Sequence, residues 1–65
     1  MKIQYFQDTD TLYIELNSNA IAETRDLDDL TLLDLDAHGR ICGITLEHAS
    51  RRTDVERVTM EGLAA

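Results

Sequence analysis

Apolar and polar side chains alternate along most of this chain, with the period of two that a β-strand shows when one face is buried. The alternation is clearest in TLYIELN, where Leu12, Ile14 and Leu16 share one face. Similar stretches, separated by short polar breaks, predict five strands at residues 2–6, 11–17, 21–27, 30–36 and 40–48. The first two strands are close enough in the sequence to pair as a hairpin.

The other predicted strands each carry an irregularity. The stretch IAETRDL is charged in a way that suits an edge strand. The doublet Leu32-Leu33 interrupts the alternation, so its strand has both faces covered or contains a bulge. Gly43 marks a bulge or a close neighbour in the last strand. Tyr5 and Tyr13 are expected to form a cross-strand pair on the first hairpin.

The period changes after Ala49, and a helix of two to three turns is expected over about residues 50–62. Thr53 and Glu56 have the spacing of a capping box, and Gly62 would end the helix. The helix would carry a short apolar stripe made of Val55, Val58, Met60 and Leu63. A helix this short needs a surface on which to pack.

The order of these elements predicts an α+β fold, in which an antiparallel β-meander of four to five strands is followed by one short C-terminal helix packed on the sheet. The 65 residues allow one domain, expected to span residues 1–65. A domain of this size buries only about 60% of the surface that its unfolded chain exposes. Cys42 is the sole cysteine, so no disulfide can form within the chain. Packing or oligomerisation must therefore stabilise the core.

The charge and the cysteine content restrict the function and the location. A net charge of −7 would repel phosphates, so nucleic acid is not an expected partner. An acidic surface keeps a small protein soluble, and it also steers basic partners. A lone cysteine is typical of a reducing setting, and we expect a cytoplasmic protein. The sequence shows neither a signal peptide nor an apolar run long enough to span a membrane.

One stretch, DLDAHGRICGI, resembles the beginning of a calcium-binding loop because Asp34 and Asp36 alternate ahead of Gly39. His38 takes the third ligand place and Thr45 the twelfth, where the loop needs a glutamate. Apolar runs flank the stretch on both sides. It therefore predicts a hairpin in which the glycine supplies a positive φ, and no metal site is expected.

Other polar residues receive structural interpretations as well. The acidic stretch from Glu23 to Asp36 lies on turns and outward faces, and its carboxylates are expected to be solvated. His38 is placed at a turn, and Cys42 on an apolar face. A small enzyme or ligand-binding site around Glu47, His48 and Ser50 remains an alternative, which requires a pocket. No catalytic residue, cofactor or metal is expected.

Three segments carry a resemblance to a known bacterial family. They are MKIQYFQDTDTLYIEL, AETRDLDD and LLDLDAHGRICGITLEHAS, and they cover about the first 50 residues in order. The chain resembles the domain of unknown function 2283 family, also described as YuzE-like. Phe6 replaces the aspartate that the family usually has after the first tyrosine, and Thr45 replaces a common glutamate. The family has no established activity, so the resemblance assigns no catalytic residue.

These observations favour a non-enzymatic module that works by protein contact and self-associates, with a dimer as the first expectation. The interface is expected on the apolar stripe of Val55, Val58, Met60 and Leu63. The alternative is an antitoxin-like acidic partner of a basic, toxin-like protein. The resemblance suggests this alternative because genes of the family often sit beside other short genes, some of which resemble toxin-like nucleases.

Overall fold

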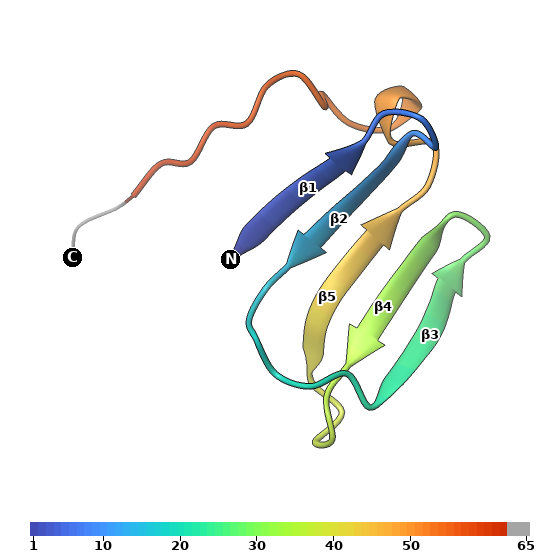
Figure 1. Cartoon of the computed structure of the whole chain (residues 1–65), viewed down its shortest axis with the longest axis vertical. Helices are drawn as coiled ribbons and strands as arrows, with labels where there is room; N and C mark the ends of the chain where they lie inside the picture. Colours follow the sequence, from blue (N-terminus) through green and yellow to red (C-terminus); the bar gives the residue numbers. More distant parts are fainter. Residues whose placement is uncertain (63–65) are drawn as a thin grey trace.

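The chain folds into one five-stranded antiparallel sheet, shown in Figure 1 by a computed structural model that describes residues 1–62. The sheet order is β1-β2-β5-β4-β3. The strands are β1 (Lys2–Phe6), β2 (Thr11–Glu15), β3 (Glu23–Asp28), β4 (Thr31–Leu35) and β5 (Ile41–Leu46). The five antiparallel strands expected from the alternation are thus confirmed, and β3 lies at an edge as its charges indicated.

Tight turns join the strands that are neighbours in both sequence and space. The turn between β1 and β2 ends at Asp10, whose φ of 54° is in the left-handed region. The turn between β4 and β5 contains Gly39 at φ 76°, which confirms the hairpin predicted for DLDAHGRICGI. Residues 16–22 connect β2 to β3 at the opposite edge of the sheet (Figure 1). The last strand, β5, therefore lies in the centre.

The register sorts the side chains onto two different faces. On the first face, one apolar row crosses four strands and a second row crosses three strands. The first row is Ile3, Ile14, Ile44 and Leu33, and the second is Tyr5, Leu12 and Leu46. We call this the apolar face. The opposite side, which we call the polar face, carries Tyr13, Thr45, Asp34 and Thr24.

The described residues form a single layer, and little is buried within it. The molecule measures 38 × 33 × 17 Å. Within residues 1–62, the buried apolar residues are Leu35, Cys42 and Ala49. The radius of gyration is 12.9 Å, against about 10.7 Å for a compact chain of this length. Stable folds ordinarily have two layers around a core, and residues 1–62 form only one layer.

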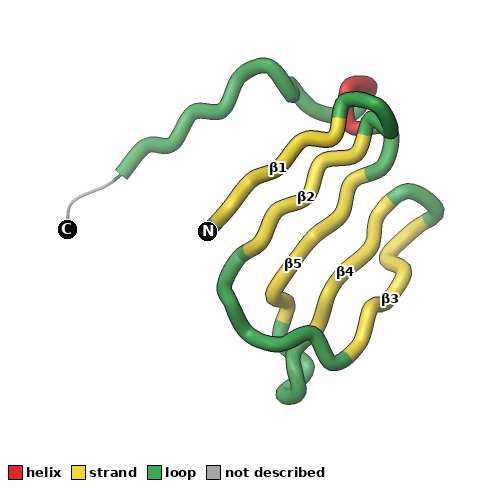
Figure 2. The backbone as a smooth tube through the Cα atoms, in the orientation of Figure 1, coloured by secondary structure: helices red, strands yellow, loops and turns green. Residues whose placement is uncertain are grey.

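The predicted helix over residues 50–62 is wrong. Helical structure in the described part of the chain is limited to one 3-10 turn, η1 (Ala49–Arg51), at the end of the sheet (Figure 2). Thr53 does not cap a helix ahead of it, because its hydroxyl donates to the Ala49 carbonyl behind it at 2.9 Å. The fold is therefore mostly β, with one helical turn, in place of the expected α+β.

Residues 53–62, which we call the C-terminal tail, contain no helix or strand. Threonine and valine are moderate helix formers, and a stretch of ten residues gains too little from its own hydrogen bonds to hold a helix alone. No helix within residues 1–62 is long and apolar enough to cross a membrane.

Candidate functional site

Asp34 forms the centre of a hydrogen-bond network on the polar face. Its carboxylate accepts from the Tyr13 hydroxyl at 2.9 Å and from the Thr24 hydroxyl at 2.8 Å. These partners lie on β2 and β3, so one side chain on β4 connects three strands. Asp34 is only 8% exposed, which contradicts the expectation that it would be solvated. The bond to Asp34 raises the pKa of Tyr13, because the hydroxyl proton is held by a carboxylate.

The contact between Tyr13 and Asp34 requires Gly43 on the intervening strand. Gly43 pairs with Glu15 on one side and Asp34 on the other. A Cβ atom at this position would overlap the Tyr13 hydroxyl oxygen and approach the Asp34 carboxylate to 3.0 Å. The close neighbour predicted for this glycine is therefore the Tyr13 side chain. The expected Tyr5–Tyr13 pair is wrong, because Tyr5 opposes Leu12 and lies on the apolar face.

Asp36 organises the turn between β4 and β5. Its carboxylate accepts from the backbone N–H groups of His38 at 2.9 Å and Arg40 at 3.0 Å, and from the Asn19 amide at 3.1 Å. The Arg40 N–H bond is the main cause of a lowered pKa at Asp36. Asp36 is 7% exposed, so it too departs from the solvated carboxylate expected here. The two aspartates that resembled a calcium loop thus bind protein groups.

No group of three or more histidine, cysteine, aspartate or glutamate side chains in residues 1–62 is placed to hold a metal ion. Cys42, the only cysteine, has a structural role. The Cys42 thiol is buried and donates to the Asp34 carbonyl at 3.4 Å. Burial raises the pKa of this thiol and disfavours the reactive thiolate.

A second polar cluster connects the first hairpin to η1. The Asp10 carboxylate accepts from the Tyr5 hydroxyl at 2.6 Å, and from the backbone N–H and the hydroxyl of Ser50 at 3.0 and 2.7 Å. The Asp10 carbonyl also accepts from Ala49 N–H at 2.9 Å. These bonds, led by that from Tyr5, lower the pKa of Asp10. The cluster therefore holds η1, which follows β5, against the turn between β1 and β2. Because its pKa is lowered, the Asp10 carboxylate is a weaker base than an ordinary aspartate.

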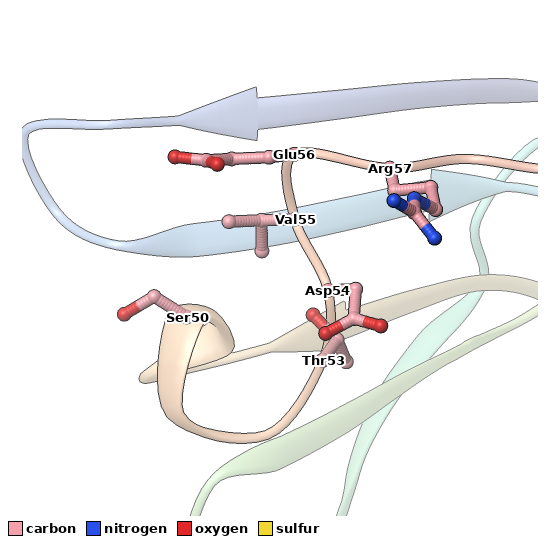
Figure 3. A pocket seen from close by; sticks show the side chains of 6 residues that line it. All are labelled: Ser50, Thr53, Asp54, Val55, Glu56 and Arg57. Carbon is pink, nitrogen blue, oxygen red and sulfur yellow. The ribbon is translucent and has the colours of Figure 1, made fainter.

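This cluster includes one of the three residues considered for an enzyme site. Ser50 lines an open hollow with Thr53, Asp54, Val55, Glu56 and Arg57 (Figure 3). Glu47 and His48 are exposed and do not line this hollow. The Ser50 hydroxyl donates to Asp10, so its proton is not directed to a histidine. The structure therefore does not bring Glu47, His48 and Ser50 together around one pocket.

The apolar face is a second candidate surface in the described part of the molecule. Ile3 and Tyr5 are 41% and 37% exposed, and the remaining members of its two rows are half-buried. The C-terminal tail passes one side of this face, and between them lies an open groove of about 530 Å³. The groove is lined by Ile3, Tyr5, Leu12 and Ile14 from the sheet and by residues 53–55 and 57–59 from the tail. Apolar side chains predominate on its sheet side.

Three of the four predicted interface residues, Val55, Val58 and Met60, lie on this tail. Val55 is half-buried beside the groove, whereas Val58 and Met60 are 67% and 77% exposed. Leu63 lies outside the described residues. The helical spacing that selected these residues is absent, but Val55 and Val58 adjoin the apolar face. The apolar face was not among the candidate sites predicted from the sequence, although the alternation of Leu12 and Ile14 signalled it.

Comparisons with known proteins give one result. The model of a family described as "Protein of unknown function (DUF2283)" matches residues 2–50, which cover all five strands and the first two residues of η1. A search of curated proteins and of solved structures finds no match to the chain. The matched segment contains both aspartate clusters and Gly43, and it ends before the C-terminal tail. The chain belongs to the DUF2283 family of proteins of unknown function.

Proposed function

We propose that this protein is a non-enzymatic module that acts by protein contact and associates with itself. The observation that carries the proposal is the apolar face of a one-layer sheet, beside which the C-terminal tail lies at β1 and β2. The accessible surface is 5247 Å², against about 4,200 Å² for a compact monomer of 7.4 kDa. The missing second layer and the extended tail both contribute to this excess. Association would remove the apolar part of the excess from water.

Analytical ultracentrifugation over about 1–100 µM tests this function. We expect a species whose mass is a multiple of 7.4 kDa, with a dimer as the first expectation. Two chains of net charge −7 repel each other, so added salt should strengthen self-association by screening that repulsion. A folded monomer throughout the concentration range, shown by circular dichroism to retain its strands, would contradict the proposal.

The second candidate is an acidic partner of a basic protein. Its support is the exposed edge strand β3, where Glu23, Asp26 and Asp28 accompany the single cation Arg25. Arg25 is itself paired with Glu23 at 3.0 Å, which leaves the edge net acidic. This candidate predicts a co-purifying basic protein whose association weakens as salt rises, opposite to the trend expected for self-association. A pull-down from the native host that recovers only this chain would count against it.

A further inference from the structure

We infer that a second copy of the chain covers the apolar face, so that two sheets pack face to face around a shared core. The inference rests on the proposed self-association and adds the location of the contact. It assigns the interface to the row of Ile3, Ile14, Ile44 and Leu33 and the neighbouring row of Tyr5, Leu12 and Leu46. The tail residues Val55 and Val58 would then lie at its rim, beside β1 and β2.

The chemistry of the two rows suits an identical partner. The seven residues of the two rows are uncharged, and the first row continues beyond Leu33 to Arg25 on the edge strand β3, where Arg25 is paired with Glu23 at 3.0 Å. The acidic groups that give each chain its charge of −7 can therefore stay outside the centre of the contact. A two-fold axis places the same patch on both sides, and an uncharged apolar patch is compatible with itself under that symmetry. Two inner faces about 10 Å apart are the usual arrangement of a β-sandwich.

The area available agrees with a dimer. The chain exposes roughly 1,000 Å² more than a compact monomer of its mass. A stable protein–protein interface of standard size buries about 800 Å² on each partner. The extended tail accounts for part of this excess, and the total is of the same order as one such interface. A second copy also supplies the missing layer, whereas a peptide added at one edge would leave the two rows uncovered.

The other surfaces of the sheet are less suited to this contact. The polar face holds the Tyr13–Asp34–Thr24 network, whose polar groups already bond to one another. The edge strand β3 carries charges along its length, and its pairing with β4 shifts register between Asp26 and Asp28. Charges and bulges are the features by which edge strands avoid pairing with other chains. Among the surfaces formed by residues 1–62, the apolar face is therefore the best suited to a contact with a second copy.

The test compares two adjacent positions in β5 that lie on opposite faces. Ile44 and Thr45 are both half-buried in the central strand. In sedimentation equilibrium, Ile44→Gln should raise the dimer dissociation constant at least tenfold, because it places an amide within the apolar contact. Thr45→Gln should leave the constant within about twofold of wild type, because residue 45 faces away from the contact. Val58→Asp, at the rim, should have an effect between these two.

Cross-linking provides a second measurement that does not depend on tolerance of Ile44→Gln. In a Cys42→Ser background, Ile3→Cys places a thiol on the apolar face, and Gln4→Cys places one on the polar face of the same strand. Face-to-face packing brings the residue-3 side chains of the two copies onto the same interface. A bifunctional thiol reagent should therefore link the Ile3→Cys chains much faster than the Gln4→Cys chains.

The possible outcomes distinguish failure of the proposed interface from failure of the proposed self-association. A wild-type monomer that is folded would overturn both the inference and the proposed function. A wild-type dimer that Ile44→Gln and Thr45→Gln weaken equally, with equal cross-linking at residues 3 and 4, would overturn the inference and leave self-association standing. A dimer dissociated by Val58→Asp alone would also overturn the inference, and it would move the interface to the tail.

Discussion

At the scale of single residues, the aspartates of this chain act as internal connectors. Asp34 joins three strands, Asp36 holds a turn, and Asp10 joins a hairpin to η1. Sequence patterns could locate the turn at Asp36, because glycine and aspartate are typical there. They could not place Tyr13 beside Asp34, because that contact spans 21 positions and depends on the strand order.

Removing the Asp34 carboxylate should destabilise the sheet. Asp34→Ala leaves the hydroxyls of Tyr13 and Thr24 without their common acceptor, and we expect a loss of about 1–3 kcal/mol in the free energy of unfolding. Asp29→Ala, at an exposed turn position, should change it by less than about 0.5 kcal/mol. Urea unfolding at fixed protein concentration measures both variants. Equal effects would show that the network contributes little.

A methyl group at Gly43 should be costly because of the Tyr13 hydroxyl. Gly43→Ala forces that hydroxyl away from Asp34, and we expect a loss of about 1–3 kcal/mol. In a Tyr13→Phe background the overlapping oxygen is absent, so the same substitution should cost less. A double-mutant cycle by urea unfolding measures the difference. Additive effects of the two substitutions would contradict the proposed close contact.

The lowered pKa values of Asp10, Asp28 and Asp36 predict the direction of acid sensitivity. Each carboxylate is favoured in the folded chain relative to its ordinary pKa of 3.8, so its stabilising contribution is present above that pKa. The contribution is lost as the pH falls below 3.8 towards the folded-state value. Urea unfolding between pH 7 and pH 2.5 should show this decline. Asp10→Asn should flatten it, and an unchanged slope would contradict the assignment.

At the scale of elements, the strands were predictable and the C-terminal segment was not. The alternation in TLYIELN fixes which side chains of β2 share a face, whatever the strand's neighbours are. The helical spacing of Val55, Val58 and Met60 is weaker evidence for a helix than this alternation is for a strand. A helix of this length depends on packing that the sequence does not reveal. The central position of β5 could not be predicted either, since the alternation does not specify which strands pair.

Arg52 anchors the exit of η1 to the sheet. Its guanidinium donates to the carbonyls of Leu30 at 2.6 Å and Glu47 at 3.1 Å, and to the Thr31 hydroxyl at 2.5 Å. We expect Arg52→Ala to lower the free energy of unfolding by on the order of 1–2 kcal/mol. The neighbouring exposed Arg51 offers a matched control, and Arg51→Ala should have little effect. Thermal or urea unfolding compares the two, and equal losses would contradict the anchor.

At the scale of the whole molecule, the proposed self-association predicts that stability depends on protein concentration. Few apolar side chains within residues 1–62 are buried, so the proposed contact between copies would add hydrophobic stabilisation that the single chain lacks. We therefore expect the thermal unfolding midpoint to rise with protein concentration, because a dimer in equilibrium with unfolded chains follows mass action. Circular dichroism melts across a hundredfold range of concentration measure this. A constant midpoint would contradict a coupled dimer.

The central position of β5 also bears on how the protein is made. Synthesis proceeds from the N-terminus, so the β1–β2 and β3–β4 pairs precede the strand that joins them. Until residues 41–46 have been added, β2 and β4 each present an unpaired inner edge. Unpaired edges readily recruit strands from other chains. A message truncated ahead of β5 would therefore yield an aggregation-prone product, and the addition of residues 41–46 protects the nascent protein by pairing both open edges.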